Sequence, residues 1–378
     1  MAALSGLKVL DFTALLPGPF ASLYLADLGA EVLRIEAVDR VDLVRLLPPA
    51  AHAWLHRGKR SIALNLKQAE AQAVVRDLVA GHDVLLEGFR PGVMARLGLD
   101  QASLRAINPR LIYASLTGFG QTGARAGRAG HDIGYLALSG LLSYGAEGRP
   151  PLLGAQLGDL AGGSQPAVIA ILAALVERER TGLGQHLDIS IRDNLLALNA
   201  LAGAVSVSGG PVPRPADGIL NGGSVYGFYE TADQRYLALG ALEPKFWQVL
   251  CTELGHPEWS GRGIGVDLQE QQELRRMLAE IFAGRTLAQW QSLFTGIDAC
   301  IEPVLDVGEA YALAEAEGRE VVWRGGSVPQ PASPLVPEHG EILPAPVPGQ
   351  HTGSVLAELG YASERIAALL ATGAAVQG

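Results

Sequence analysis

The chain has 378 residues, of which 48% are hydrophobic and 18% are charged, and its formal net charge is −10. This composition excludes a disordered chain, and the length predicts two domains, or one large domain with an appendage. The acidic balance argues against a general nucleic-acid binder and requires a local cationic patch for any anionic ligand.

Strand-like and helix-like segments alternate along the first half of the chain. The expected strands are 7–12, 31–36, 61–66, 83–87, 111–116 and 186–191. The expected helices are 20–28, 67–80, one that ends at 107, and 165–178. Because strands that alternate with helices are typical of βαβ units, the sequence predicts an α/β fold with a mostly parallel sheet.

The composition changes at residues 206–227, which are rich in Gly, Pro and Ser and lack periodicity. We interpret them as a linker or active-site loop. Beyond this loop, a strand and several helices predict a smaller α+β domain over 228–326. The proline-rich segment 327–349 is expected to be extended, and a final helical pair follows it. The large domain is therefore expected over 1–205, completed by 327–378.

Cysteine usage and apolar segments indicate the compartment. Cys251 and Cys300 lack the spacing of a metal site, so two reduced thiols are expected. Residues 1–30 lack the pattern of a signal peptide. The most apolar stretches, Ala167–Val176 and Leu195–Val207, are too short to span a bilayer and are predicted to be core helices. We expect a soluble cytoplasmic protein with no membrane span.

A glycine-rich loop, 118-GFGQTGARAGRAG-130, leads directly to His131. Its first residues match the spacing of a dinucleotide-binding loop. The loop continues through further glycines instead of opening a helix, which disfavours a nicotinamide or flavin site. Taken alone, His131 is as consistent with a structural histidine or an exposed loop residue as with a catalytic role.

Two carboxylates further along the chain complete a set of acid–base candidates. Asp159 lies in the apolar stretch 151-PLLGAQLGDLAGG-163, and Glu243 precedes Pro244. Each is also consistent with a residue at the start of a helix. Together with His131, they are the groups that proton transfer on two sides of a carbon acid needs.

Other familiar site patterns are absent from the sequence. There is no G-x-S-x-G elbow and no complete phosphate loop, and His52 and His56 lack an evident third metal ligand. Basic residues concentrate in the first 67 residues, and they form either a solvated surface or a phosphate-binding patch. They are Arg34, Arg40, Arg57, Lys59, Arg60 and Lys67.

Long stretches of the chain resemble the family III CoA transferase superfamily of the CaiB/BaiF type and, within it, the α-methylacyl-CoA racemases. The stretches that carry the resemblance are 4-LSGLKVLDFTALLPGPFASLYLADLGAEVLRIE-36, 83-DVLLEGFRPGVMARLGL-99, 108-NPRLIYASLTGFGQTG-123, 129-AGHDIGYLALSG-140 and 299-ACIEPVLDVGEA-310. The resemblance implies a Rossmann-like large domain, a smaller domain, and a homodimer of two interlocked ring-like chains. Each active site then lies between the large domain of one subunit and the small domain of the other.

The superfamily contains two chemistries, and the resemblance implies which residues separate them. Transferases use the aspartate that matches Asp159 as a covalent nucleophile. Racemases keep it as an acid or base and add a histidine and a glutamate, matched here by His131 and Glu243. The resemblance therefore implies an isomerase, an acyl-CoA racemase or epimerase acting on a 2-methylacyl-CoA-type thioester. A CoA transferase and a non-catalytic acyl-CoA-binding dimer are the alternatives.

In this mechanism His131 and Asp159 exchange the roles of base and acid, and Glu243 orients the imidazole. The N–H groups of residues 160–163 are expected to stabilise the enolate oxygen. CoA enters as part of the substrate, without a metal or redox cofactor.

The resemblance also implies the residues that contact CoA. Asn65, Lys67, Arg90, Gly130 and Tyr135 occupy matching positions. Many relatives have a cationic residue where this chain has Ala37, so Arg40 is the candidate substitute, together with Arg34 of the basic set. Gly134 and Asn221 depart from the family pattern, and the sequence does not predict the acyl chain.

Overall fold

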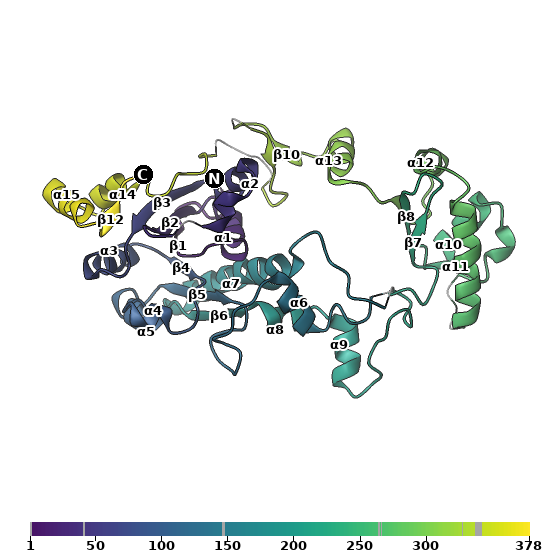
Figure 1. Cartoon of the computed structure of the whole chain (residues 1–378), viewed down its shortest axis with the longest axis horizontal. Helices are drawn as coiled ribbons and strands as arrows, with labels where there is room; N and C mark the ends of the chain where they lie inside the picture. The colour runs from purple at the N-terminus through teal and green to yellow at the C-terminus, as the bar shows by residue number, and fades with distance from the viewer. Residues whose placement is uncertain are drawn as a thin grey trace. The chain divides into compact units, whose positions relative to one another are not determined.

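The computed structural model describes residues 2–40, 42–145, 148–263, 265, 267–326, 328–336 and 342–378. The chain forms two compact units, which Figure 1 shows from the N-terminus in purple to the C-terminus in yellow. Unit 1 comprises Met1–Ser139, Leu153–Leu198 and Ala314–Gly378, and unit 2 comprises Gly140–Leu152 and Asn199–Leu313.

Unit 1 is built on a sheet whose strand order is β12-β3-β2-β1-β4-β5-β6. The strands are β1 (Lys8–Asp11), β2 (Glu31–Ala37), β3 (Lys59–Leu64), β4 (Val84–Glu87), β5 (Ile112–Thr117), β6 (His186–Ser190) and β12 (Ala375–Val376). Neighbouring strands are parallel, except that β12 runs antiparallel to β3. This confirms the prediction of an α/β fold with a mostly parallel sheet.

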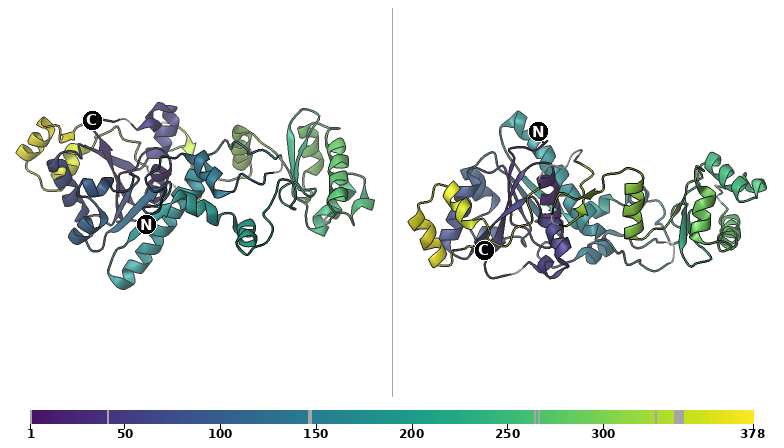
Figure 2. Two further views of the ribbon diagram at one scale, coloured as in Figure 1. Left: turned by 60° about the horizontal axis from the view of Figure 1, so that its bottom comes forward. Right: turned by 90° about the horizontal axis from the view of Figure 1, so that it is seen from above.

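Helices cover both faces of this sheet. They are α1 (Pro17–Asp27), η1 (Leu43–Leu46), α2 (Pro49–His56), α3 (Ala69–Val79), α4 (Val93–Arg96), α5 (Gln101–Ile107), α6 (Asp132–Ser139), the π-helix η2 (Gly158–Ser164), α7 (Gln165–Thr181), α8 (Ile191–Ala197), α14 (Thr352–Glu358) and α15 (Ser363–Ala371). Helices α3, α5, α14 and α15 share one core with the sheet, and α1 and α7 pack together and against its strands. Figure 2 shows the sheet between these helical layers.

The central strands are apolar because both faces of the sheet are covered. Val9 and Leu10 of β1 and Val84, Leu85 and Leu86 of β4 are all fully buried. Continuous apolar runs of this kind are typical of parallel strands between two helical layers.

One helical run, Gly158–Thr181, is long and apolar enough by composition to cross a membrane, judged over the described residues. Its inner face, which includes Ala167, Ile171 and Ala174, is buried, and it contacts α1 and β5. One face of the run therefore belongs to the core, as the sequence predicts for Ala167–Val176, whereas Ile169 and Val176 on its other side are exposed.

Unit 2 contains the antiparallel sheet β7-β8-β9 with helices packed against it. Its elements are α9 (Ala200–Val207), β7 (Gly227–Glu230), β8 (Tyr236–Leu239), α10 (Pro244–Glu253), η3 (Pro257–Trp259), α11 (Leu268–Phe282), α12 (Leu287–Phe294) and β9 (Ile301–Pro303). Trp247, Phe282 and Trp290 are central to its core. Helix α13 (Val307–Ala316) and the short pair β10 (Val322–Trp323) and β11 (Gln330–Pro331) follow in the chain.

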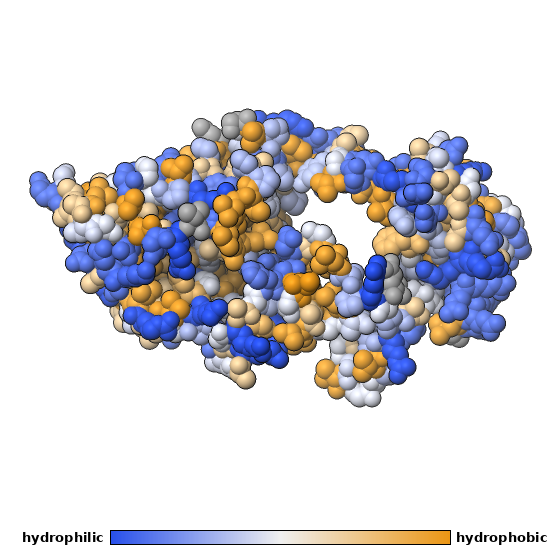
Figure 3. Space-filling model, in the orientation of Figure 1, coloured by the Kyte–Doolittle hydropathy of each residue, from blue (hydrophilic) through white to orange (hydrophobic). Residues whose placement is uncertain are grey.

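The prediction of a core helix over Leu195–Val207 is wrong for its second half. Leu195 of α8 is buried, but α9 has no buried residue. Leu201, Val205 and Val207 are exposed in this chain, and Figure 3 shows orange apolar side chains on α9. Apolar composition predicts a helix that favours burial, but it does not identify the surface that buries it.

Candidate active site

A cavity of about 300 Å³ lies at the carboxyl ends of β1, β4 and β5. Strands β1 and β4 are neighbours in the sheet, and the strand order reverses between them. In open α/β sheets this switch point leaves a crevice in which ligands bind. The lining residues come from the segments that follow these strands and from η2: Thr13, Gly18, Arg90, Arg128, Gly130, His131, Tyr135 and Asp159 are among them.

His131 reaches the cavity through the glycine-rich loop that follows β5. Two hydrogen bonds from the Gln121 N–H to the Asp188 carboxylate of β6, each 3.0 Å, tie the start of this loop to the sheet. Gly120 has a φ of +76°, a backbone conformation that other residues rarely adopt. The loop ends at His131, and α6 begins at the next residue.

Tyr135 explains why the glycines at both ends of the loop are needed. A Cβ atom at Gly118 or at Gly130 would lie 2.4 Å from the Tyr135 ring, which is too close for any real contact. The ring also packs edge-on against Phe119, with 5.4 Å between the ring centroids. Burial and the nearby Asp159 raise the pKa of Tyr135 to about 12, so its phenol keeps its proton at neutral pH.

Asp159 lies in the first turn of the π-helix η2, which leads into α7. Single π-turns within α-helices are rare and occur frequently at functional sites. Two contacts hold this turn: the Asp159 N–H donates to Asp132 Oδ1 at 2.9 Å, and Ser164 Oγ donates to the carbonyl oxygen of Pro17 at 2.7 Å. The second contact joins the turn to the first residue of α1, the helix that follows β1.

The environment of the Asp159 carboxyl group brings its pKa closer to neutral pH. Burial, followed by the charge of Asp132, raises its pKa from 3.8 to about 6, although His131 acts in the opposite direction. Among the described residues, none donates a hydrogen bond to its carboxyl oxygens. An acid–base group with a pKa close to neutrality suits proton transfer in either direction.

The first N–H group of the expected enolate site at residues 160–163, that of Leu160, is already hydrogen-bonded. The Leu160 N–H donates to the carbonyl oxygen of Gln156 at 3.0 Å, and the Asp159 N–H is taken by Asp132. The π-turn therefore uses N–H groups that a regular helix start would leave free.

A buried polar network that the sequence does not reveal supports the loop after β1. Asp11 accepts hydrogen bonds from the Thr13 N–H and from Ser22 Oγ, and Lys59 Nζ donates to Ser22 Oγ at 2.8 Å and to the carbonyl oxygen of Pro19 at 2.7 Å. Burial lowers the pKa of Lys59 to about 7.

Basic residues that the sequence groups as one patch therefore have different environments. Lys59 and Arg57 are fully buried. Arg34 is 3% exposed, and its guanidinium pairs with Asp42 at 3.3 Å and contacts His56. These three side chains face the protein interior, and a role for Arg34 at CoA stays a prediction.

The other predicted CoA contacts fall into two groups. Arg90, Gly130 and Tyr135 line the same cavity as His131 and Asp159. Asn65 and Lys67 follow β3, where Lys67 Nζ pairs with Asp39 at 2.6 Å, and Arg40 is exposed near the end of β2.

Glu243 belongs to unit 2, where it is the residue before α10 and is exposed. His131 and Asp159 belong to unit 1. Unit 1 thus brings His131 and Asp159 to one cavity, whereas the contact of Glu243 with His131 stays a prediction.

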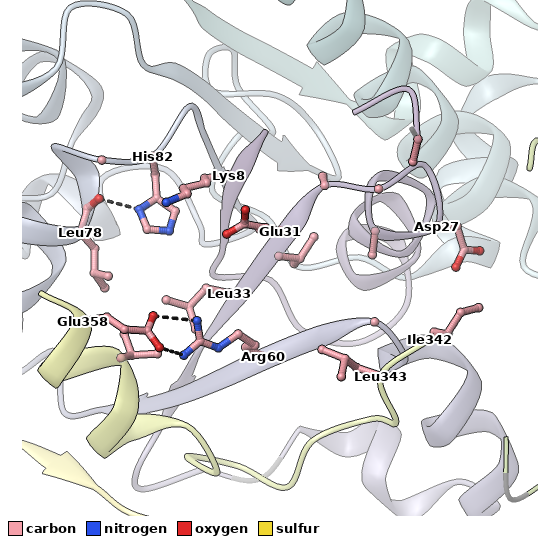
Figure 4. Close-up of a pocket in the computed structure, with 18 of the residues that line it drawn as sticks. Lys8, Asp27, Glu31, Leu33, Arg60, Leu78, His82, Ile342, Leu343 and Glu358 are labelled. Carbon is pink, nitrogen blue, oxygen red and sulfur yellow. Dashed lines mark hydrogen bonds and ion pairs between the residues drawn. The ribbon is translucent and has the colours of Figure 1, made fainter. Parts of the chain in front are cut away.

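A larger cavity, of about 640 Å³, lies at the opposite, amino-terminal edge of the sheet and is shown in Figure 4. Several of its charged groups have partners: Arg60 makes two hydrogen bonds to Glu358, which also lines the cavity, and Asp27 pairs at 2.8 Å with Arg57, which does not line it. The His82 Nδ1–H donates to the carbonyl oxygen of Leu78, and burial lowers the pKa of that histidine. Such paired groups are poorly suited to acid–base catalysis.

The described residues contain no group of three or more His, Cys, Asp or Glu side chains that could hold a metal ion. His52 and His56 do lie together, with 4.7 Å between their ring centroids, but Arg34 occupies the space beside His56. Cys251 and Cys300 are both free thiols.

Comparisons with known proteins identify the family and agree with the fold. A family model described as CoA-transferase family III matches residues 4–352. An alpha-methylacyl-CoA racemase of Mus musculus is 38% identical over 373 residues, which cover 96% of this chain and 95% of that protein. An acetyl-CoA:oxalate CoA-transferase of Acetobacter aceti is 34% identical over 343 residues, which cover 87% of this chain and 88% of that protein.

Among solved structures, a CAIB/BAIF family protein from Brucella suis has a TM-score of 0.81 at 28% identity, covering 95% of this chain and 99% of that chain. The relatives therefore include both racemases and transferases.

Proposed function

The chain belongs to CoA-transferase family III, and we propose that within this family it is an acyl-CoA racemase or epimerase. It would invert the α-carbon of a 2-methylacyl-CoA-type thioester by moving one proton off that carbon and another onto it. The observation that carries the proposal is the meeting of His131 and Asp159 at one cavity.

The chemistry requires two acid–base groups. The α-hydrogen of a thioester is weakly acidic, so one group must remove it while a second, protonated group stands ready to return a proton on the other face. In one direction the Asp159 carboxylate removes the proton and the His131 imidazolium delivers one. In the other direction the neutral imidazole is the base and the Asp159 carboxyl group is the acid.

The enolate that forms between these steps needs stabilisation of its oxygen. Helix α6 begins directly after His131. Its Gly134 and Tyr135 N–H groups donate to the His131 carbonyl oxygen at 2.8 and 3.2 Å, so the N–H groups of Asp132 and Ile133, which precede them, are the candidates for this role. The positive end of the α6 dipole therefore favours negative charge at this edge of the cavity. This assignment replaces the one at residues 160–163.

The CoA moiety would be held by positively charged and backbone groups around the cavity. Arg90, which follows β4, and Arg128, in the glycine-rich loop, line it together with Gly130. In this reaction CoA enters only as part of the substrate. A homodimer in which Glu243 of one subunit orients His131 of the other belongs to the same proposal.

The second candidate is a CoA transferase that uses Asp159 as a nucleophile and forms an acyl anhydride. The relatives that are transferases support this alternative. The transferase mechanism requires Asp159, but in it His131 has no role in proton transfer. This difference separates the two candidates.

Deuterium exchange at the α-carbon of a 2-methylacyl-CoA, with no acceptor acid present, tests the proposal. We expect exchange with the wild-type chain and a loss of at least about a hundredfold in His131→Ala, because one of two acid–base groups is removed. His256→Ala is the matched control, because this histidine pairs with Glu258 on unit 2 and belongs to no proposed site. An acyl group trapped on the enzyme by hydroxylamine, without α-exchange, would instead establish the transferase.

A further inference from the structure

Asp132 connects the two candidate acid–base residues. It follows His131 directly in the chain and is the first residue of α6. Its Oδ1 atom accepts the Asp159 N–H at 2.9 Å across a separation of 27 residues. Asp132 is therefore adjacent to His131 in the chain, and its carboxylate is hydrogen-bonded to the backbone of Asp159.

Gly158 shows how closely α6 and η2 approach each other at this point. A Cβ atom on Gly158 would lie 2.8 Å from Asp132 Oδ1 and 3.1 Å from the Asp132 carbonyl oxygen. Any side chain at 158 would push the two segments apart and lengthen the hydrogen bond to Asp159. The glycine thus allows the Asp132 carboxylate to reach the backbone of Asp159.

The Asp159 carboxyl group has charged neighbours of both signs. Asp132 and His131 act on it electrostatically, and Tyr135, Arg90 and Arg128 are the other titratable or charged groups that line the same cavity. Asp132 is the neighbouring carboxylate among them, and like charges side by side favour the protonated form of one partner.

We infer that Asp132 is a positioning residue for the reaction proposed above, on which this inference rests. It fixes the turn that carries Asp159, and its negative charge keeps a proton on the Asp159 carboxyl group at a higher pH. In agreement, Asp132 raises the pKa of Asp159 in addition to the effect of burial, whereas His131 lowers it.

The two effects of Asp132 can be separated by two substitutions. Asp132→Asn keeps an oxygen that can accept the Asp159 N–H but removes the charge, whereas Asp132→Ala removes both. Glu179→Gln is the control for loss of one negative charge, because it lies at the far, exposed end of α7. Circular dichroism at each pH verifies that the variants are folded.

The rate of α-hydrogen exchange is measured against pH for each enantiomer of the substrate. With one enantiomer Asp159 must be ionised, and with the other it must be protonated. Each enantiomer gives a pH–rate profile with one limb that reflects the ionisation of Asp159. For Asp132→Asn we expect this limb to move to lower pH by about one unit in both profiles, with KM nearly unchanged. For Asp132→Ala we expect an additional loss of kcat of about 10- to 100-fold, because Asp159 is no longer held in place.

A titration that does not depend on activity completes the test. The ¹³C carboxyl resonance of Asp159, identified by its loss in Asp159→Asn, is followed against pH in the wild type and in Asp132→Asn. A downward shift of its midpoint in the variant supports the inference even if the wild type shows no α-exchange, in which case only the proposed function fails. Coincident midpoints, or coincident pH–rate profiles, in the wild type and Asp132→Asn overturn the inference.

Discussion

Replacing Asp159 by Asn should stabilise the folded chain at alkaline pH. The Asp159 carboxylate is largely buried, and among the described residues it receives no hydrogen bond on its oxygens. Burial and the charge of Asp132 raise its pKa, so the folded state resists ionisation of this group. Asn has nearly the same shape and carries no charge, so the substitution removes this destabilising effect.

The size of the effect follows from the shift of the pKa from 3.8 to about 6. At about 1.36 kcal/mol for each pH unit, the full shift corresponds to about 3 kcal/mol above pH 6. Asp159 is not completely buried and solvent screens part of the charge, so we expect about 1–3 kcal/mol.

The sign depends on pH in a defined way. Between the unfolded pKa and the folded pKa the folded state binds more protons, so the destabilisation by Asp159 is fully present above pH 6 and disappears as the pH falls toward 4. The stabilisation by Asp159→Asn should therefore be large at pH 8 and small at pH 4.

Urea unfolding followed by circular dichroism at both pH values measures this difference. Asp298→Asn is the matched control, because Asp298 is an exposed aspartate. The reasoning fails if Asp159→Asn does not raise the unfolding midpoint at pH 8, or if it raises the midpoint equally at pH 4.

Two further contrasts can be measured by thermal unfolding. Gly118→Ala should lower stability by about 1–3 kcal/mol because its Cβ would overlap the Tyr135 ring, whereas Gly127→Ala, with open space around it, should be neutral; equal melting temperatures would contradict this. Arg57→Met should cost about 3–5 kcal/mol because it leaves the buried Asp27 unpaired, whereas Arg60→Met breaks an exposed pair and should cost less than about 1 kcal/mol. A larger loss for Arg60→Met would refute the distinction.

The strands of the large sheet could be predicted from the sequence because their local signal is strong. β1, β4 and β5 are short apolar runs bounded by polar or glycine residues, and their observed ends differ from the predicted ones by a residue or so. β12 has two residues and pairs with β3 at the sheet edge, so no local pattern could reveal it. Its position depends on a tertiary contact.

Burial of charged residues could not be predicted for the same reason. A lysine or arginine in a sequence is expected to be exposed, since few proteins bury one without a partner. Lys59 and Arg57 are buried because their partners come from elsewhere in the chain: Ser22 and Pro19 for Lys59, and Asp27 for Arg57. For Lys59 and Arg57, the pattern of basic residues therefore predicted a surface position where the structure has internal contacts.

The candidate site could be predicted in part from the sequence. Residue type and context made His131 and Asp159 candidates, and only the resemblance to a known family implied their roles; their meeting depends on the strand order. The loop that carries His131 leaves β5 beside β4, and the turn that carries Asp159 is tied by Ser164 to the start of α1, the helix that follows β1. Because β1 and β4 are neighbours at the switch point, both segments reach the same crevice.

This arrangement bears on the choice between the two chemistries. A covalent nucleophile needs one anchored carboxylate, and the Asp159 turn alone would provide it. The chain also anchors a second acid–base group on a separate segment, with Tyr135 packed between glycines to hold it and Asp132 joining the two. Two separately anchored groups at one cavity are what the proposed proton transfer between two faces of a carbon requires, whereas the alternative transferase chemistry requires only Asp159.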